Sequence, residues 1–264
     1  MAGIEADAEP AYFGMGRVAA RTFEVFGKNF FPFLVLSTIS IAPPMLLSFI
    51  VARYQPVSTA PAVLPNVTTG LLFIATGILQ LIMAYFLQGA LVQGTVTTLN
   101  GAPASLGDCL STALRRLPRL IGLGILSALA FGLGALLLVV PGLILITMWS
   151  VVVPVCVVED KTIGACFSRS RELTRNHRWA IFGLLFGFGL ICLIAGLAIF
   201  PLAGVSLFPG GHRGLPSGAT YWIANTLLQI VTSTIGAVGV ASIYYELRTI
   251  KEGIGPEQLA AVFA

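Results

Sequence analysis

Two clusters of arginine stand between long apolar stretches and are the residues here best suited to bind a ligand. They are Arg115, Arg116 and Arg119 in the first cluster and Arg171, Arg175 and Arg178 in the second. A guanidinium group donates paired hydrogen bonds that match the oxygens of a phosphate. The clusters therefore indicate either sites for lipid phosphate headgroups, or basic signals that orient a membrane protein and attract anionic lipids generically. The residue pattern leaves both interpretations open.

A second polar pattern consists of amides within the apolar stretches. Asn225 and Gln229 are four residues apart, and Gln80 and Gln88 are eight apart, so each pair falls on one face of a helix. Such faces line a solute path in a permease, or they join neighbouring helices through hydrogen bonds. Both interpretations are kept.

Catalytic constellations are not apparent. No Asp, Glu, Lys or Arg lies near the middle of an apolar stretch, where a charge would mark a proton relay or a catalytic centre. His177 and His212 are expected on opposite sides of the membrane. The four cysteines form no CxxC pair and have no histidine at metal-ligand spacing. We predict a protein that is not an enzyme and that uses no cofactor and no metal.

The composition indicates what must position these residues. The chain has 264 residues, of which 56% are hydrophobic and 10% charged, whereas a soluble domain has about 25% charged residues. Its mean hydropathy is +0.92. The net charge of +4 comes from short basic clusters, which does not indicate a nucleic-acid binder. Residues 1–264 are expected to form a single integral membrane domain.

A membrane-spanning helix needs about 20 apolar residues. Pro43 and Pro44 are expected to kink or break the first span, and Pro141 and Gly142 to form a tight hairpin turn. The sequence thus predicts an all-α transmembrane fold with about six spans, arranged as three helical hairpins. The predicted spans are 30–51, 70–95, 120–140, 143–158, 179–202 and 220–245.

The basic residues predict the orientation of these spans. Thirteen of the 15 Lys and Arg fall on one predicted side, and Arg53 and Arg213 fall on the other. Because basic residues are concentrated in cytoplasmic loops, the first side is predicted to be cytoplasmic. An even number of spans then places both termini in the cytoplasm.

The chain also shows signs of an internal repeat. Each cytoplasmic segment that precedes an odd-numbered span is predicted to be an amphipathic helix at the membrane surface. Residues 105–111 read SLGDCLS and residues 162–168 read TIGACFS, which share a hydroxyl, a Gly, a Cys and a Ser at the same positions. The predicted repeats are 12–98, 104–159 and 162–250.

Three further segments carry a resemblance to a known family. They read VVPGLILITMWSVVVPVCVVED, ACFSRSRELTRNHRW and YYELRTIKEG. They resemble the membrane domain of some bacterial glycerophosphoryl diester phosphodiesterases and related stand-alone, uncharacterised multi-pass proteins. The resemblance implies a multi-pass protein of the bacterial inner membrane. It does not carry over the phosphodiesterase activity, because the hydrolase of those enzymes is a separate barrel domain.

Together these patterns favour a non-enzymatic multi-pass membrane protein that acts as a scaffold, an anchor or a lipid-interacting envelope factor. The expected partners are membrane lipids, including anionic ones, and not nucleic acid or metal. The alternative is a small permease or transporter of lipids or solutes, with a polar path between the second and sixth spans.

Overall fold

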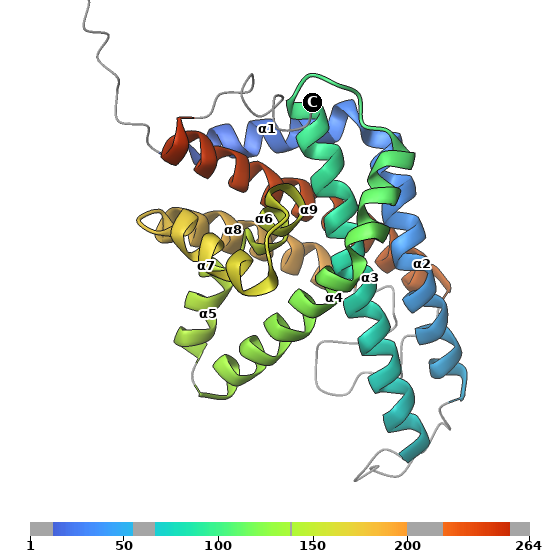
Figure 1. Cartoon of the computed structure of the whole chain (residues 1–264). Coiled ribbons are helices and arrows are strands. Elements are labelled where there is room, and N and C mark those ends of the chain that lie inside the picture. Colours follow the sequence, from blue (N-terminus) through green and yellow to red (C-terminus); the bar gives the residue numbers. More distant parts are fainter. Residues whose placement is uncertain (1–12, 55–66, 138, 200–218, 254–264) are drawn as a thin grey trace, which may run out of the picture.

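The structure is a computed structural model that describes residues 13–54, 67–137, 139–199 and 219–253. Within these residues every regular element is an α-helix, which confirms the predicted all-α class (Figure 1). Both predicted cytoplasmic termini, as well as His212 and Arg213, lie outside the described residues. The helices are α1 (Met15–Lys28), α2 (Phe30–Tyr54), α3 (Val67–Leu99), α4 (Leu106–Leu137), α5 (Val139–Met148), α6 (Val152–Glu159), α7 (Ile163–Thr174), α8 (Arg178–Ile199) and α9 (Ala219–Glu252).

Five helical stretches in the described chain are long and apolar enough to cross a membrane. Large apolar side chains cover their outer surfaces; on α8, for example, Ile191 is 67% exposed. Hydrocarbon suits this surface because the exposed side chains are apolar. A helix can also stay in hydrocarbon because its interior backbone hydrogen bonds are all made within the helix. The five stretches are Phe30–Val51, Gly70–Leu99, Gly142–Glu159, Arg178–Ile199 and Thr220–Glu252.

The predicted third span is not among these five. Residues 120–137 form the apolar second half of α4, whose first half carries Asp108 and the first arginine cluster. The surface helix and the span predicted here are therefore one continuous helix that passes through Pro118. At the other two such junctions, Asn29 and Asn176 adopt non-helical backbone angles that separate α1 from α2 and α7 from α8. The α4 sequence has no Asn at the corresponding point.

The predicted fourth span consists of two short helices, α5 and α6, with a turn at residues 149–151. Pro154 explains this turn. Its ring lacks an N–H group and would collide with the carbonyl of Ser150 in a continuous helix. In the first turn of α6, however, the missing N–H has no acceptor to lose.

The prolines predicted to mark turns lie inside helices. Pro141 and Gly142 were expected to form the hairpin turn, but they belong to the first turn of α5, which begins at Val139, and α4 already ends at Leu137. A proline in a first turn loses no helical hydrogen bond. Pro43 and Pro44 do not break α2, which continues to Tyr54. Next to them the Ser48 hydroxyl donates to the Pro44 carbonyl at 2.8 Å.

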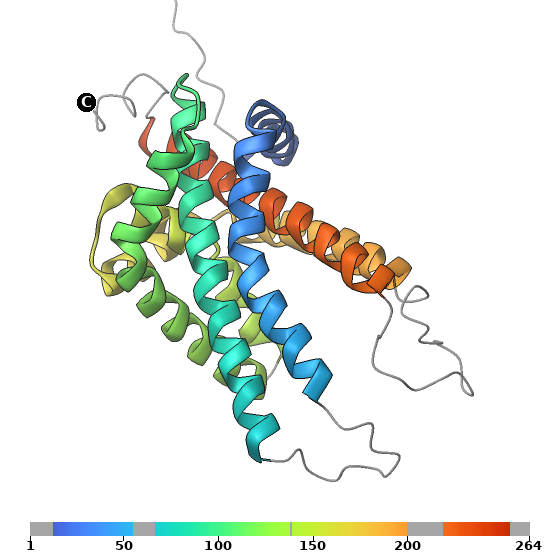
Figure 2. The same cartoon turned by 90° about the vertical axis from the view of Figure 1, so that its right-hand side faces the viewer.

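The helices diverge from one end of the molecule. Figure 2 shows α2 and α3 side by side, with α9 crossing them at a steep angle and α8 following α9. The short helix α6 lies at the centre of the core, where every residue from Val152 to Val158 is buried. Around it pack α3, α4, α7 and α9. This core positions the charged segments that adjoin it.

Candidate functional site

The charged segments that precede or follow the apolar helices are joined to one another by ion pairs. Arg17 and Arg21 of α1 lie 2.8 and 3.0 Å from the carboxylate of Glu246 on α9. Arg116 of α4 lies 3.2 Å from Asp160, which follows α6. The four basic segments therefore meet at one end of the molecule. The sequence predicted that these segments share a side.

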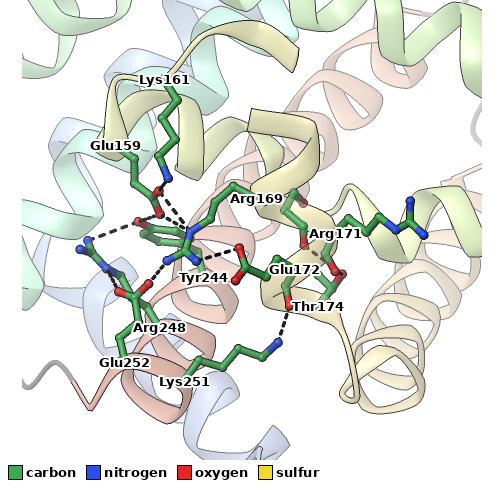
Figure 3. Close-up of polar contacts among 11 residues, drawn as sticks. Glu159, Lys161, Arg169, Arg171, Glu172, Thr174, Tyr244, Arg248, Lys251 and Glu252 are labelled. Carbon is green, nitrogen blue, oxygen red and sulfur yellow. Dashed lines mark hydrogen bonds and ion pairs between the residues drawn. The ribbon is translucent and has the colours of Figure 1, made fainter. Parts of the chain in front are cut away.

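The largest group of charges, called here the closed network, joins the end of α6, helix α7 and the end of α9 (Figure 3). Arg169 is its centre: it contacts Glu159 at 3.3 Å, Glu172 at 3.1 Å and also Glu252. The other members are Lys161, which pairs with Glu159 at 2.7 Å, Arg248, which pairs with Glu252 at 2.7 Å, and Tyr244, whose hydroxyl donates to Glu159 at 3.1 Å.

Acids surround Arg169 closely enough to change its ionisation. Burial lowers the pKa of Arg169, but hydrogen bonding to Glu172 and the charge of Glu159 outweigh that effect and raise its pKa overall. The side chains of Glu159 and Arg169 are 9% and 19% exposed. A charge this far from water is stable only with its partners in place. The closed network therefore holds the end of α6, helix α7 and the end of α9 together.

The turn between α5 and α6 holds α7 in position. At this turn the N–H of Val152 donates to Trp149, so the Met148 carbonyl loses its helical donor. The hydroxyls of Ser170 and Thr174 on α7 donate to that carbonyl at 2.9 and 3.3 Å. This fixes the rotation of α7 about its own axis.

With its rotation fixed, α7 turns its second arginine, Arg171, away from the closed network. At 100° per residue, Arg171 lies on the side of the helix opposite Arg169. Figure 3 shows the Arg171 guanidinium pointing away from the closed network. Arg171 and Arg175 are both exposed.

These arginines line a cavity of about 790 Å³ between the end of α7 and the start of α8, called here the arginine pocket. Asn176 makes the turn possible with a φ of 75°, a left-handed value that Asn tolerates better than most residues. Across the described chain, the ion pairs leave the pocket's three arginines without an acidic partner. The lining is Ser168, Arg171, Glu172, Arg175, Asn176, Arg178 and Trp179.

The one acid in the lining does not neutralise these arginines. Glu172 directs its carboxylate to Arg169, 3.1 Å away. The Nε of Arg178 is buried and, among the described residues, has no hydrogen-bond partner. Three positive charges around an open cavity suit an anion such as a phosphate group, whose oxygens accept hydrogen bonds from guanidinium groups.

The first arginine cluster is divided between two roles. Arg116 and Arg119 both pair with Asp160, and Arg116 also donates to the Cys156 carbonyl at 2.8 Å. Arg115 is exposed and has no ion pair within the described ranges. Of the six predicted arginines, the three of the second cluster thus share a cavity, whereas two of the first cluster bind a carboxylate.

The predicted amide stripes do not converge on one cavity. Gln80 is exposed, whereas Gln88 lines a cavity of about 210 Å³ with Tyr85, Ser127 and Trp149. That cavity contains none of the other three amides. Asn225 and Gln229 are half-buried on α9.

Sequence reasoning missed the acids and one polar seam. Glu246 is 3% exposed and receives two arginines from α1. Within the apolar region, the hydroxyls of Ser37 and Thr234 lie 2.5 Å apart and join α2 to α9. The buried acids could have been found from the sequence, because a lone acid stands beside each basic segment. The contact between Ser37 and Thr234 could not, because a single hydroxyl in an apolar helix is not distinctive.

The residues that could hold a metal do not gather. Within the described ranges, no group of three or more His, Cys, Asp or Glu residues is placed to bind a metal ion. Comparison with known proteins adds no neighbour: no family model, no curated protein and no solved structure matches this chain.

Proposed function

We propose that the protein is a non-enzymatic, multi-pass membrane protein that binds the phosphate headgroup of anionic lipids in its arginine pocket. One observation carries this proposal. Arg171, Arg175 and Arg178 surround an open cavity without acidic partners in the described chain, at the start of the apolar helix α8. Arginine at that level of a membrane protein contacts lipid phosphates.

The proposal includes six crossings, with α4 supplying the sixth. Its apolar half, residues 120–137, is about 27 Å long at 1.5 Å per residue, close to the roughly 30 Å of a hydrocarbon core. The ion pairs that connect the four basic segments support a common side for all of them. By the positive-inside tendency that side is cytoplasmic. The resemblance to bacterial inner-membrane proteins stays a prediction.

A scaffold or anchor needs a rigid surface, and the closed network supports that part of the proposal. It joins α6, α7 and α9 next to the arginine pocket. The pocket is therefore held by helices that are themselves tied together. Such pre-organisation lowers the entropic cost of binding.

Lipid retention by a matched pair of variants tests the proposal. Arg175 and Arg115 are both exposed arginines without an ion pair in the described chain, but only Arg175 lines the pocket. The protein is reconstituted in equal amounts of phosphatidylglycerol and phosphatidylethanolamine and purified in detergent, and the retained lipids are measured by mass spectrometry. We expect wild type and Arg115→Gln to retain an excess of phosphatidylglycerol, and Arg175→Gln to lose most of it.

Two results would contradict the proposal. One is a wild-type protein that retains both lipids in the proportions supplied. The other is an equal loss in Arg175→Gln and Arg115→Gln, which would reduce the pocket to a general basic surface.

A further inference from the structure

An apolar groove of about 370 Å³ lies between α5 and α8. Leu143, Ile146 and Thr147 form its α5 side. Its α8 side consists of Phe182, Leu185, Phe186, Gly189, Leu190 and Leu193. No charged side chain lines it, so its contents must be apolar.

The groove continues the arginine pocket along α8. Trp179 lines the pocket, and Phe182 and Phe186 line the groove; they follow at intervals of three and four residues, on one face of the helix. Their rings form a row, with centroids 6.1 Å apart from Trp179 to Phe182 and 5.6 Å apart from Phe182 to Phe186. Trp179 is 86% exposed, as is typical of an aromatic side chain at the level of the headgroups.

The other wall of the groove begins at the same level. The end of α5 is fixed beneath α7 by the hydrogen bonds from Ser170 and Thr174 to Met148. Both walls therefore start beside α7, which carries Arg171 and is followed by Arg175. The arginine pocket would therefore face the headgroup of a membrane lipid, and the groove would extend from it in the direction of the acyl chains.

The length of the groove fits one leaflet of a bilayer. Phe182 and Leu193 are 11 residues apart, about 16 Å along a helix that rises 1.5 Å per residue. Half of a hydrocarbon core of about 30 Å is about 15 Å. An acyl chain that starts at the pocket would therefore end where the groove ends.

We infer that one phospholipid with an anionic headgroup binds here as a unit, with its phosphate among Arg171, Arg175 and Arg178 and one acyl chain in the groove between α5 and α8. This inference rests on the proposed function and adds to it, since it assigns the occupant of the groove. A free phosphate would use the pocket and leave the groove empty. A change in the groove should therefore affect binding of a long-chain lipid but not binding of a ligand whose chains are too short to fill the groove.

Two glycines of α8 provide the test. Gly189 lines the groove, and a Cβ at this position would meet no atom within 4 Å, so a side chain can start here and Gly189→Leu is designed to occupy the groove. Gly187 is two residues away, on the other side of the helix, and a Cβ there also meets nothing within 4 Å. Gly187→Leu is therefore the matched control.

The measurement is the dissociation constant of dipalmitoyl and dihexanoyl phosphatidylglycerol by native mass spectrometry. We expect Gly189→Leu to weaken binding of the dipalmitoyl lipid about tenfold, because the Leu side chain displaces about two methylenes of the chain. Its affinity for the dihexanoyl lipid should stay that of wild type, as should both affinities of Gly187→Leu. Arg175→Gln should weaken binding of both lipids.

The outcomes separate this inference from the proposed function. If Gly189→Leu binds the dipalmitoyl lipid as wild type does, or loses no more than Gly187→Leu, the groove does not hold the chain and the inference is overturned. An effect of Arg175→Gln on both lipids would leave the headgroup proposal standing in that case. If Arg175→Gln changes neither affinity, the proposed function itself is overturned.

Discussion

Helix α7 presents two contrasting faces. On one, Arg169 contacts three carboxylates in the closed network and is 19% exposed. On the other, Arg171 lines the open arginine pocket together with Arg175, which follows the helix, and no acid of the described chain forms an ion pair with either. The same residue type within one short helix therefore has two roles. What separates the roles is the neighbouring helices, since α9 supplies Glu252 to one face and nothing acidic to the other.

The largest expected difference between the faces is in stability. Arg169→Ala leaves Glu159 and Glu252 close together without their shared partner, and breaking such a buried pair costs about 3 kcal/mol of unfolding free energy. Arg171→Ala should cost less than about 0.5 kcal/mol, as expected at an exposed position. Thermal unfolding in detergent measures both. Equal melting temperatures for the two variants would remove the distinction between the faces.

Helix α1 is attached to α9 through a second buried acid, Glu246, which can be compared with an exposed acid on α1. Glu246→Ala should cost about 2 kcal/mol, because hydrogen bonds to a charged group are lost from Arg17 and Arg21. Glu24 is the control: it pairs with Lys28 at 2.7 Å, but both side chains are more than 60% exposed. Glu24→Ala should leave the free energy of unfolding almost unchanged, because an exposed ion pair contributes little.

Hydrogen exchange can locate this second effect. We expect the amides of α1 to exchange faster in Glu246→Ala than in Glu24→Ala. Unchanged protection of α1 in Glu246→Ala would mean that the buried contacts of Val18 and Val25 hold the helix without the ion pairs.

Salt should affect the two faces unequally. Between 0.1 and 1 M salt the Debye length falls from about 10 to 3 Å, which screens exposed charges much more than buried ones. The preference for phosphatidylglycerol should fall severalfold over this range, with a much smaller change in melting temperature. A melting temperature that falls as steeply as lipid retention would place the closed network in contact with solvent.

The smallest expected effect concerns His177, which lies between α7 and α8. Burial, and then the charge of Lys251, lower the pKa of His177. A lowered pKa means that the folded protein disfavours the protonated form, so stability is present above about pH 6.5 and is lost as the pH falls below it. We expect His177→Gln to flatten the decline in melting temperature between pH 7 and 6. A decline as steep as that of wild type would assign the effect to other groups.

Much of the fold could be predicted from the residues alone. Missing charge and apolar stretches indicated an all-α protein with several helices fit for a membrane, and the basic residues grouped segments that the ion pairs do connect. The turn at residues 149–151 was not predicted, because residues 143–158 are mostly apolar and a proline such as Pro154 does not by itself end a helix: α4 continues through Pro118. The boundary before Pro141 was placed too late because proline is as well accommodated in a first helical turn as in a loop.

The candidate site was only partly predictable, because charge partners come from distant parts of the chain. Arg171, Arg175 and Arg178 were candidates for phosphate contacts because of their guanidinium groups, and the structure shows that all three line one cavity. Nothing in that residue type separated them from Arg116 and Arg119, which Asp160 occupies. Only the packing of α4 against the end of α6 decides between a free and an occupied guanidinium.

The ion pairs between α1 and α9 also constrain the order of assembly. Arg17 and Glu246 are 229 residues apart in the chain. At about 5–20 residues per second, synthesis takes roughly 10 to 50 s to cover that distance. During this interval α1 has left the ribosome, but its partner helix does not yet exist. Docking of α1 against α9 is therefore a late event in biogenesis, which cannot begin until α9 has been synthesised.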